Sequence, residues 1–527
     1  MTDNPPSASR QIARAAGTVM LAFVLSNLAG LARQILVAHA FGTQAEIEAF
    51  NAANRVAETL FNLVAGGALA SAFIPTFTGI LTQGDKKGAW RLASSIFNLI
   101  LFTMVGAIVL AALFAPQITR SVLAPGFASE PAKEALTISL MRMMLPSAAI
   151  FGVSGLIMGI LNAHQVFFIP ALTPSMYQLG LIFGVLVLTP KMGIYGLAWG
   201  VLVGAGLHLG LQIPALLRQK GQYFPTLGIE YAPVREVARL LGPRLLGVAV
   251  VQLNFWVNTR LASLQPEGSV TAIVTAFALM LMPQAAIAQS VAIAAMPTLA
   301  AQYARGQLRE MRRSLADSLR GVLLLSIPAS LGLMLLRQPV ITLLYQRGAF
   351  DSRSTELVAW ALLWYAAGLV GHSLVEVLAR AFYALHDTRT PVLVGALAMA
   401  LNVIFSLLFS ALFSRIGWLP HGGLALANTL ATALEAVGLV YYMRRRLEGM
   451  QGDFILRGSL QAAAGALVMS AGIWIWLAWA GESPAWRTTL GGLVIGGGIY
   501  SVVMWVMGVK EVKGMVAMIS GYIARNR

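Results

Sequence analysis

Long apolar runs follow one another along almost the entire chain of 527 residues. Each run has about 20 residues, the length that an α-helix needs to cross about 30 Å of hydrocarbon, and short polar turns separate the runs. The pattern predicts an all-α integral membrane protein with about fourteen transmembrane helices. Their expected ranges are 15–38, 56–82, 92–115, 136–161, 167–189, 193–217, 244–264, 270–299, 319–336, 356–384, 391–413, 422–443, 457–480 and 486–508.

Composition supports the bilayer as the solvent of this chain. Hydrophobic residues make up 57% of the sequence and charged residues 11%, which would leave a soluble globule with too much apolar surface. The chain has no cysteine, which excludes disulfides, thiolate catalysis and cysteine metal sites. The first span is long and lacks a clear small-residue cleavage site, so we expect an uncleaved signal anchor after a polar tail.

The distribution of basic residues predicts the topology. When the N-terminus is placed in the cytoplasm, most of the 37 Lys and Arg residues fall on the cytoplasmic side, as the positive-inside rule requires. An even number of spans then leaves both termini in the cytoplasm. The net charge of +16 is therefore a signal of topology and of anionic lipids. A nucleic-acid partner is not expected, because the chain contains no soluble basic domain.

One pattern occurs twice, about 221 residues apart. The run LNAHQVFFIPAL at 161–172 aligns with FYALHDTRTPVL at 382–393, and AFIPTFTGIL at 72–81 aligns with AAMPTLAAQY at 294–303. Duplicated halves in an apolar chain are typical of transporters whose two bundles rock around a shared site. The expected divisions are a cytoplasmic tail at 1–14, an N-terminal lobe at 15–230, a C-terminal lobe at 231–450, and two further helices with a cytoplasmic tail at 451–527.

Motifs for catalysis are missing from the sequence. It has no GxxxxGK[ST] phosphate loop, no HExxH and no cluster of His, Asp and Glu, so we expect a transporter without catalytic residues, metal or cofactor. The six histidines are scattered over loops and helix ends, where we expect them to be solvated or interfacial.

Polar residues inside the apolar runs are more informative, because each costs about 2.5–3.5 kcal/mol at the bilayer centre unless it faces protein or water. They recur at spacings of three and four, which places them on one face of a helix. The first span carries Ser26, Asn27, Gly30, Arg33 and Gln34, the second helix carries Asn51, Asn54, Arg55, Glu58 and Asn62, and the seventh carries Asn254 and Asn258.

These faces predict a hydrated vestibule between the two halves, in which Arg33 and Arg55 contact an anion. A guanidinium group suits phosphate, because its planar fork can donate two hydrogen bonds at once. The alternative is that these residues tie helices together, or that Arg55 extends to the membrane interface. The candidate substrate-binding residues are Arg33, Arg55, Asn27, Gln34, Asn54 and Asn258.

The loop that ends the second copy of the repeat has a mechanical explanation. Thr390 is expected to cap the next helix, with Pro391 in its first turn, where a missing N–H does no harm. Asp387 and Arg389 are expected to tie the turn together. Rigid corners of this kind would let helix pairs move as bodies, or they only terminate helices. The structural loop motif comprises Asp387, Thr388, Arg389 and Pro391.

Four stretches resemble the MurJ/MviN family of lipid II flippases. They are GALASAFIPTF at 67–77, SGLIMGILNAHQVFFIPALTP at 154–174, AIAAMPTLAAQYARGQ at 292–307, and the run from RGAF to RTPV at 347–392. The resemblance implies the fold of the multidrug/oligosaccharidyl-lipid/polysaccharide (MOP) exporter superfamily. That fold has two six-helix lobes and two extra C-terminal helices, which form a groove for an isoprenoid tail.

The resemblance also implies a function. The family moves the lipid-linked peptidoglycan precursor across the bacterial cytoplasmic membrane by alternating access, driven by membrane potential or by a Na⁺ or H⁺ gradient. The implied partners are a lipid-linked anionic substrate of the undecaprenyl diphosphate type, membrane lipids and cell-wall synthesis proteins. A monomer is expected, because alternating access within one chain needs no oligomer.

By this resemblance, Arg33 and Arg55 match basic residues of the family's cavity. Other positions depart from the family's charges: Asn27, Gln34, Glu48, Phe61, Glu376, and Phe277 with Ala278, where many members carry an Asp-Arg pair. Three alternatives to lipid II transport stay open. They are a flippase for another lipid-linked oligosaccharide, a non-transporting scaffold for cell-wall synthesis, and a cation-coupled drug exporter.

Overall fold

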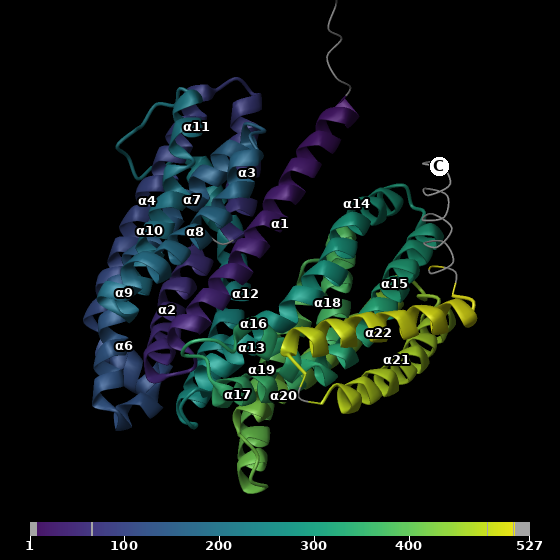
Figure 1. The fold of residues 1–527 in the computed structure, drawn as a ribbon. Coiled ribbons are helices and arrows are strands. Elements are labelled where there is room, and N and C mark those ends of the chain that lie inside the picture. Colours follow the sequence, from purple (N-terminus) through teal and green to yellow (C-terminus); the bar gives the residue numbers. More distant parts are fainter. Residues whose placement is uncertain (1–7, 65–66, 482, 510, 512–527) are drawn as a thin grey trace, which may run out of the picture. The chain divides into compact units, whose positions relative to one another are not determined.

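A computed structural model describes residues 8–64, 67–481, 483–509 and 511 (Figure 1). In these residues the regular structure is entirely helical, which confirms the predicted all-α class. Residues 1–7 and 512–527, parts of the predicted terminal tails, lie outside the described residues. The rest of the predicted N-terminal tail, residues 8–14, belongs to α1 (Ala8–Phe41).

Contacts divide the chain into two compact units. The first unit ends at Val270 and also includes Arg347–Phe350, and the second comprises the other residues from Thr271 onward. The first unit contains α1, α2 (Ala45–Val64), α3 (Gly67–Thr82), α4 (Lys86–Leu113), α5 (Ala115–Gln117), η1 (Ile118–Leu123), η2 (Pro125–Ser129), α6 (Pro131–Met144), α7 (Pro146–Ala163), α8 (Phe168–Phe183), η3 (Gly184–Leu188), α9 (Thr189–Met192), α10 (Ile194–Gly210), α11 (Ile213–Arg218) and α12 (Ala232–Ser263).

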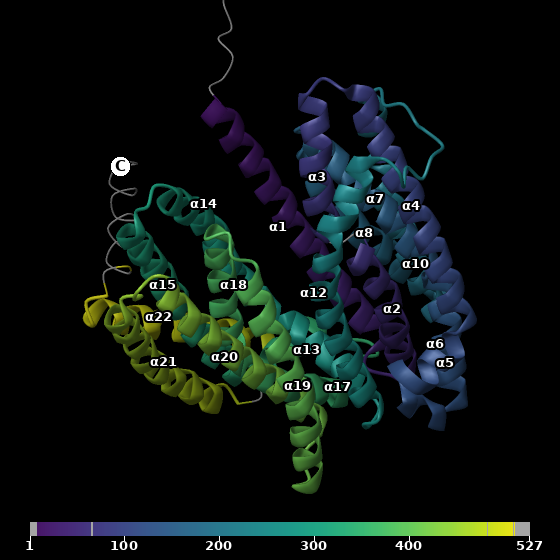
Figure 2. The ribbon, with the colours of Figure 1, turned by 180° about the vertical axis from the view of Figure 1, so that it is seen from behind.

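The second unit carries the remaining helices (Figures 1 and 2). They are α13 (Ser269–Gln284), whose first two residues belong to the first unit, η4 (Ala285–Gln289), α14 (Ser290–Ala304), α15 (Leu308–Leu335), α16 (Arg337–Tyr345), α17 (Ser352–Ala367), α18 (Leu369–Ala384), α19 (Arg389–Arg415), α20 (His421–Arg446), α21 (Gly452–Ala480) and α22 (Ala485–Val506). The repeat would place α12 at the start of the second half, whereas contacts group it with the first unit. The division at residue 230 stays a prediction.

The predicted spans fall on helices wherever the structure describes them. Among the described residues, ten helices are long and apolar enough to cross a membrane, or up to twelve if each of two bent pairs is one span. One such pair is α17 and α18, which meet at a bend of 47°. The chain is thus a multi-pass membrane protein, while the count of fourteen spans stays a prediction.

Small residues and aromatic rings hold the first unit together. Gly180 on α8 lies directly against the backbone of Gly204 on α10, where any larger residue would collide. Small residues allow membrane helices to approach closely, which strengthens their van der Waals packing. The core between α3, α4 and α7 includes Phe73, Phe77 and Leu92, all fully buried. This packing fixes the helices that carry the polar residues described below.

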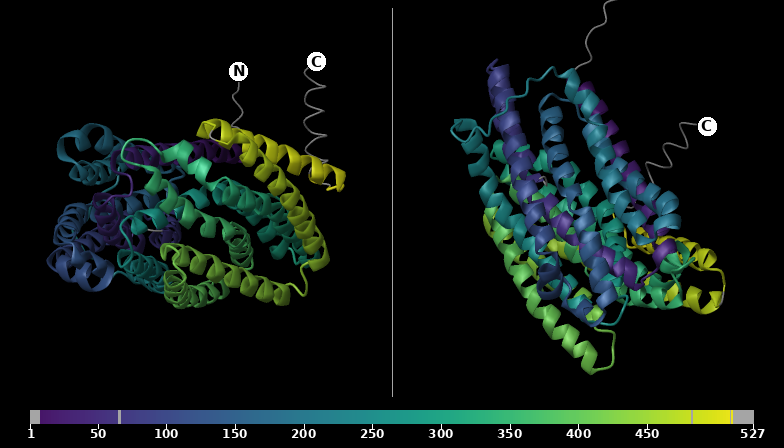
Figure 3. Two further views of the ribbon diagram at one scale, coloured as in Figure 1. Left: turned by 60° about the horizontal axis from the view of Figure 1, so that its bottom comes forward. Right: turned by 90° about the vertical axis from the view of Figure 1, so that its left-hand side faces the viewer.

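In the second unit, the last two helices are fastened to α15. The buried side chain of Arg320 on α15 donates to Glu511 at 2.7 Å and to Gln461 on α21 at 3.2 Å. Its guanidinium also lies 4.4 Å from the centre of the Phe454 ring. Helices α21 and α22, drawn in yellow, lie side by side in both views of Figure 3. A buried arginine with three partners makes this a fixed attachment.

The sequence repeat is also a repeat of backbone conformation. Gln165 and His386 occupy matching places after α7 and α18, and both adopt the left-handed conformation, with φ of 61° and 58°. In each copy the next residue donates its N–H back into the last turn, from Val166 to Leu161 at 2.9 Å and from Asp387 to Phe382 at 3.0 Å. The two halves therefore end these helices in the same way.

The corner at Asp387 differs in detail from the prediction. Thr388 is the residue before α19, and Asp387 supplies the capping side chain in place of Thr390. One carboxylate oxygen accepts from the N–H groups of Arg389 at 3.1 Å and Thr390 at 3.0 Å, and the other accepts from the Thr390 hydroxyl at 2.7 Å. Pro391 is buried in the first turn, as predicted.

Burial of the Asp387 carboxyl acts to raise its pKa, but hydrogen bonds from Thr390 and Arg389 and the charge of Arg446 outweigh this, and the pKa is held below its ordinary value. We expect Asp387→Ala to cost about 1 kcal/mol in unfolding free energy, the usual loss for a helix cap. Because the pKa of Asp387 is lower in the folded protein, its ionised carboxylate stabilises the fold at pH values above the ordinary pKa. This stabilisation is lost as the pH falls through the folded-state pKa of Asp387. The difference in unfolding free energy between wild type and Asp387→Ala should therefore decrease as the pH is lowered.

Thermal unfolding of the purified protein in detergent measures this effect. Thr388→Ala is the matched control, because the Thr388 side chain makes no capping hydrogen bond. Equal unfolding temperatures for Asp387→Ala and wild type at neutral pH would contradict the capping role.

Candidate functional site

The polar faces predicted for the first two helices lie in the first unit. Helix α1 packs along α8, where Gly30 of α1 lies 3.6 Å from the Gln178 amide, measured from an ideal Cβ. A pocket of about 390 Å³ opens beside this contact. Its lining includes Asn54, Glu58 and Asn62 of α2, Tyr177 and Gln178 of α8, and His208 of α10. The spacing of three and four in α2 thus delivers several polar side chains to one cavity.

Arg33 contributes positive charge to this region. Its side chain is half-buried, and its Nε has no hydrogen-bond partner among the described residues. The guanidinium of Arg33 and the carboxylate of Glu58 both act electrostatically on the Tyr177 hydroxyl, so the three groups share one polar environment. The buried Oε1 of Gln178 also lacks a partner in the described part of the chain. Unsatisfied buried polar atoms usually mark a place where water or a ligand binds.

Arg55 is already engaged. Its Nη1 donates to Glu58 at 2.9 Å, and its guanidinium lies 4.9 Å from the centre of the Phe255 ring on α12. Asn54 donates to the other oxygen of the Glu58 carboxylate at 3.1 Å. Glu58 is 44% exposed, and partly exposed ion pairs contribute only about 0–1 kcal/mol. The Arg55–Glu58 pair itself therefore contributes little to stability.

A buried histidine also lines the pocket. The His208 ring is 7% exposed and its Nδ1 lies 2.6 Å from the Ser154 hydroxyl, which also accepts from Gln212. His421 in the second unit is fully buried and bonds to the Leu357 carbonyl at 2.9 Å. The prediction that the histidines are solvated or interfacial is wrong for these two. The position of His208 or His421 on its own helix does not show which neighbouring helix buries the side chain.

The remaining candidate residues lie elsewhere. Asn27 is exposed on α1, and Gln34 is half-buried one residue after Arg33. Asn258 is buried on α12, where its amide donates to Asn254 at 3.1 Å. The structure therefore gathers Asn54 and Arg55 around Glu58. Asn27, Gln34 and Asn258 are not among the described residues that line the pocket. The vestibule between the two halves stays a prediction.

Positions that depart from the family's charges have structural partners. Phe277 packs against Tyr365 and His372, with ring centres 5.2 and 5.9 Å away. Glu376 pairs with Arg380 at 2.6 Å on the same helix. At these positions the second unit has aromatic packing and a local ion pair.

Glu48 belongs to a buried ion pair in the first unit. Its carboxylate accepts from Lys133 Nζ at 2.7 Å and from the N–H of Val270 at 2.8 Å. The Lys133 ammonium also lies 4.3 Å from the centre of the Phe127 ring. Both side chains are almost fully buried, at 2% and 4% exposure. The pair joins α2 to α6 and to the start of α13.

No group of three or more His, Asp or Glu residues that could hold a metal ion occurs within the described ranges. The pocket is thus lined by amide, hydroxyl and imidazole groups, by the Glu58 carboxylate and by apolar side chains. The guanidinium of Arg55 adjoins it through its bond to Glu58. These groups suit a hydroxylated molecule, and the neighbouring guanidinium suits an anionic one.

Comparison with known proteins agrees with this architecture. A relative from Burkholderia cenocepacia, named lipid II flippase MurJ, is 29% identical over 513 residues, covering 94% of this chain and 98% of the relative. A relative from Rhizobium tropici, named probable lipid II flippase MurJ, is 29% identical over 453 residues, covering 85% of this chain and 83% of the relative.

Solved structures show the same fold. The structure of lipid II flippase MurJ in an inward closed conformation matches with a TM-score of 0.80 at 24% identity, covering 93% of this chain and 98% of the other. An inward-facing multidrug resistance MATE transporter of the MOP superfamily matches with a TM-score of 0.68 at 16% identity, covering 80% and 94%. The sequence model of the family described as lipid II flippase MurJ matches residues 37–485. The chain therefore belongs to the lipid II flippase MurJ family.

Proposed function

We propose that this protein moves lipid II, a lipid-linked peptidoglycan precursor, across the cytoplasmic membrane by alternating access. The observation that carries the proposal is the family match over residues 37–485, which spans both copies of the repeat. The duplicated construction supports it, because two bundles that move around a shared site are the general design of such transporters. The protein acts as a transporter and not as an enzyme.

The first unit offers contacts for the charged part of such a substrate. A diphosphate brings several acceptor oxygens, which Arg33 and Arg55 suit as planar donors. The buried Nε of Arg33 can donate a hydrogen bond to a substrate oxygen. Arg55 must break its bond to Glu58 before it can donate to the substrate. Asn54, already bonded to Glu58, would be released in the same step. Glu58 thus acts as an internal competitor that keeps Arg55 oriented when no substrate is bound.

This arrangement predicts opposite effects for the two partners. Arg55→Gln should weaken substrate binding about 10- to 100-fold, because a hydrogen bond to a charged group contributes about 1.5–3 kcal/mol. Glu58→Gln should leave binding equal or tighter, because it removes the competitor. Binding of lipid II to the purified protein measures both. If Glu58→Gln weakens binding as strongly as Arg55→Gln, Glu58 is a substrate contact and the competitor assignment is wrong.

The membrane setting follows from the family and the charge pattern. We place the protein in a bacterial cytoplasmic membrane with both termini in the cytoplasm, where the basic loops would lie. Membrane potential or a Na⁺ or H⁺ gradient would drive the cycle, since the chain has no phosphate loop for ATP. The protein would work as a monomer, alongside membrane lipids and proteins of cell-wall synthesis.

Complementation tests the proposal. A bacterium depleted of its own lipid II flippase should grow when it expresses this chain, and lipid II should become accessible at the outer leaflet. Growth without outward lipid II would favour transport of another lipid-linked oligosaccharide. A chain that localises to the membrane but restores neither would favour the non-transporting scaffold. Drug resistance on overexpression, without growth support, would favour a drug exporter.

A further inference from the structure

A second pocket lies in the first unit and shares no residue with the candidate substrate site. It has a volume of about 590 Å³ and lies where the ends of α3, α4, α7 and α11 meet the segment after α11. Its lining is basic, with Lys86 and Lys87 from α4, and Arg218 and Lys220 at the end of α11. Trp90 and His164 add an indole and an imidazole. This end of the unit is the one that the positive-inside rule assigns to the cytoplasm.

The cations of this pocket lack counter-charges. Within residues 8–64, 67–481, 483–509 and 511, no carboxylate lies within 4.0 Å of the basic groups of Lys86, Lys87, Arg218 or Lys220. Asp85 is adjacent in sequence, but its carboxylate caps α4 by accepting from Gly88 at 2.7 Å. Four unpaired cations around one cavity create a strong attraction for an anion.

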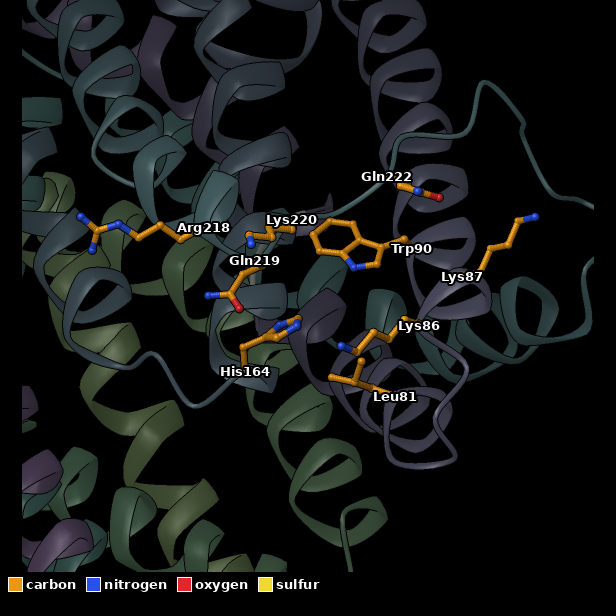
Figure 4. A pocket seen from close by; sticks show the side chains of 9 residues that line it. All are labelled: Leu81, Lys86, Lys87, Trp90, His164, Arg218, Gln219, Lys220 and Gln222. Carbon is orange, nitrogen blue, oxygen red and sulfur yellow. The ribbon is translucent and has the colours of Figure 1, made fainter. Parts of the chain in front are cut away.

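The side chains divide into an inner pair and an outer pair. In Figure 4 the ammonium end of Lys86 extends toward the His164 ring, and Lys220 lies beside the Trp90 indole. Arg218 and Lys87 extend away from the centre of the pocket. Lys86 and Lys220 are therefore the candidates for direct contact with a bound anion, and the outer pair adds general attraction.

The pocket wall is held firmly. The Trp90 ring packs against the backbone of Gly221, where a side chain would collide with the indole. Beyond it, the N–H of Phe224 donates to Ser94 at 3.1 Å, and Asn98 donates to the Thr226 carbonyl at 2.9 Å. These bonds tie the segment after α11 onto α4. The site is thus preformed, which lowers the entropy cost of binding.

An apolar pocket adjoins the basic one. It has a volume of about 250 Å³ and shares Trp90 and Gln222 with the basic pocket. Its other lining residues include Phe97, Leu156 and Leu217, and the Leu217 side chain is 70% exposed. A basic cavity that continues into an apolar one matches a molecule with an anionic head and a hydrocarbon chain. A soluble phosphate would leave the apolar part unused.

The second repeat does not reproduce this site. By the offset of the repeat, Lys86 corresponds to Leu308 and Trp90 to Arg312. Arg312 has a carboxylate partner, since its Nη2 lies 3.6 Å from Glu448. The second repeat therefore lacks a cation at the position of Lys86, so the pairing of Lys86 with Lys220 around one cavity is specific to the first unit.

We propose that this two-part pocket binds an anionic glycerophospholipid of the cytoplasmic leaflet, with the phosphate between Lys86 and Lys220 and an acyl chain along Trp90 into the apolar pocket. Anionic lipids enrich that leaflet, and basic residues near its surface attract them. The segment on which Lys220 lies joins the last helix of the first repeat to α12. A bound lipid would link this connection to the end of α4.

Lipid retention by the purified full-length protein tests the proposal. Delipidated protein in neutral detergent is titrated with phosphatidylglycerol, and bound lipid is counted by native mass spectrometry. We expect the protein to retain phosphatidylglycerol in preference to phosphatidylcholine. The Lys86→Gln/Lys220→Gln variant should retain phosphatidylglycerol about 10- to 30-fold more weakly, because each lysine that is removed should reduce lipid affinity by about tenfold or less. The matched control is Arg309→Gln/Arg313→Gln, which removes two exposed cations from the corresponding turn of the second repeat.

Three results would overturn the assignment. The first is unchanged retention in the Lys86 and Lys220 double variant. The second is an equal loss in the control, which would indicate general surface charge. The third is full displacement of the lipid by millimolar inorganic phosphate, which would assign the pocket to a soluble anion. Unfolding temperatures without lipid should match wild type in both double variants, so that loss of folding cannot imitate loss of binding.

Discussion

Replacing Arg33 by glutamate should abolish growth support in a bacterium depleted of its own lipid II flippase, while expression and folding stay intact. Arg33 is half-buried, and its Nε has no partner among the described residues, so its removal breaks no hydrogen bond at that atom. Loss of a hydrogen bond to a charged substrate group costs about 1.5–3 kcal/mol, or about 10- to 100-fold in binding. A carboxylate at the same position adds repulsion of the phosphates.

Variants at the same position separate charge from geometry. Arg33→Lys keeps the charge but loses the planar fork, so we expect partial growth. Arg415→Glu is the matched control, because Arg415 is exposed at the end of α19. Protein amount in the membrane fraction and the unfolding temperature show whether each variant folds. Normal growth with Arg33→Glu at wild-type expression would reject the anion-binding role.

The second large effect concerns stability. Breaking the buried pair between Glu48 and Lys133 should destabilise the first unit by about 3–5 kcal/mol, because the remaining buried partner keeps its charge but loses its closest opposite charge. Lys133→Met leaves the buried Glu48 carboxylate with backbone hydrogen bonds from Gly268 and Val270 but without its ammonium partner. Glu48→Gln leaves the ammonium against the Phe127 ring. Each single variant should lower the unfolding temperature and the yield of folded protein.

The double variant makes this prediction specific. Glu48→Gln/Lys133→Met removes both charges together, and replacement of a whole buried pair is often neutral or stabilising. We therefore expect the double variant to unfold at a higher temperature than either single variant. Glu130→Gln is the control, since Glu130 is 51% exposed and lies 3.8 Å from Lys133. If the effects of the two single variants simply add in the double variant, the two residues do not act as a pair.

Helical periodicity predicted the polar face of α2 that lines part of the pocket. Spacings of three and four placed Asn54 and Glu58 on one face of α2, and the structure finds both in one pocket. Helical spacing does not determine the partner of each polar side chain, because a cavity, a neighbouring helix or another side chain on the same face can equally satisfy its hydrogen bonds. Asn258 illustrates this limit, since it bonds to Asn254 one turn away on its own helix.

Distant contacts were beyond the reach of sequence patterns. Glu48 and Lys133 lie 85 positions apart, and the basic pocket joins residues from the start of α4 to residues after α7 and α11, so these meetings depend on how the helices pack. His208 could not be recognised as buried, because its burial depends on α7 and on the bond to Ser154. At the corner after α18, more than one side chain could cap the start of α19, and the structure shows that Asp387 does so rather than Thr390.

The sequence by itself determined the solvent, the helical class and the duplication. Hydrophobic content and run length indicate the solvent and the helical class, and the alignment of 161–172 with 382–393 indicates the duplication. The left-handed turns at Gln165 and His386 fall at matching positions of the two copies. Only the tertiary structure decided which charges are neutralised. Lys133 pairs with Glu48, 85 positions away in the sequence, whereas no carboxylate of the described chain lies within 4.0 Å of the basic groups of Lys86 and Lys220. The physical reason is that electrostatic and hydrogen-bond energies depend on distances in space, which packing fixes and local sequence does not.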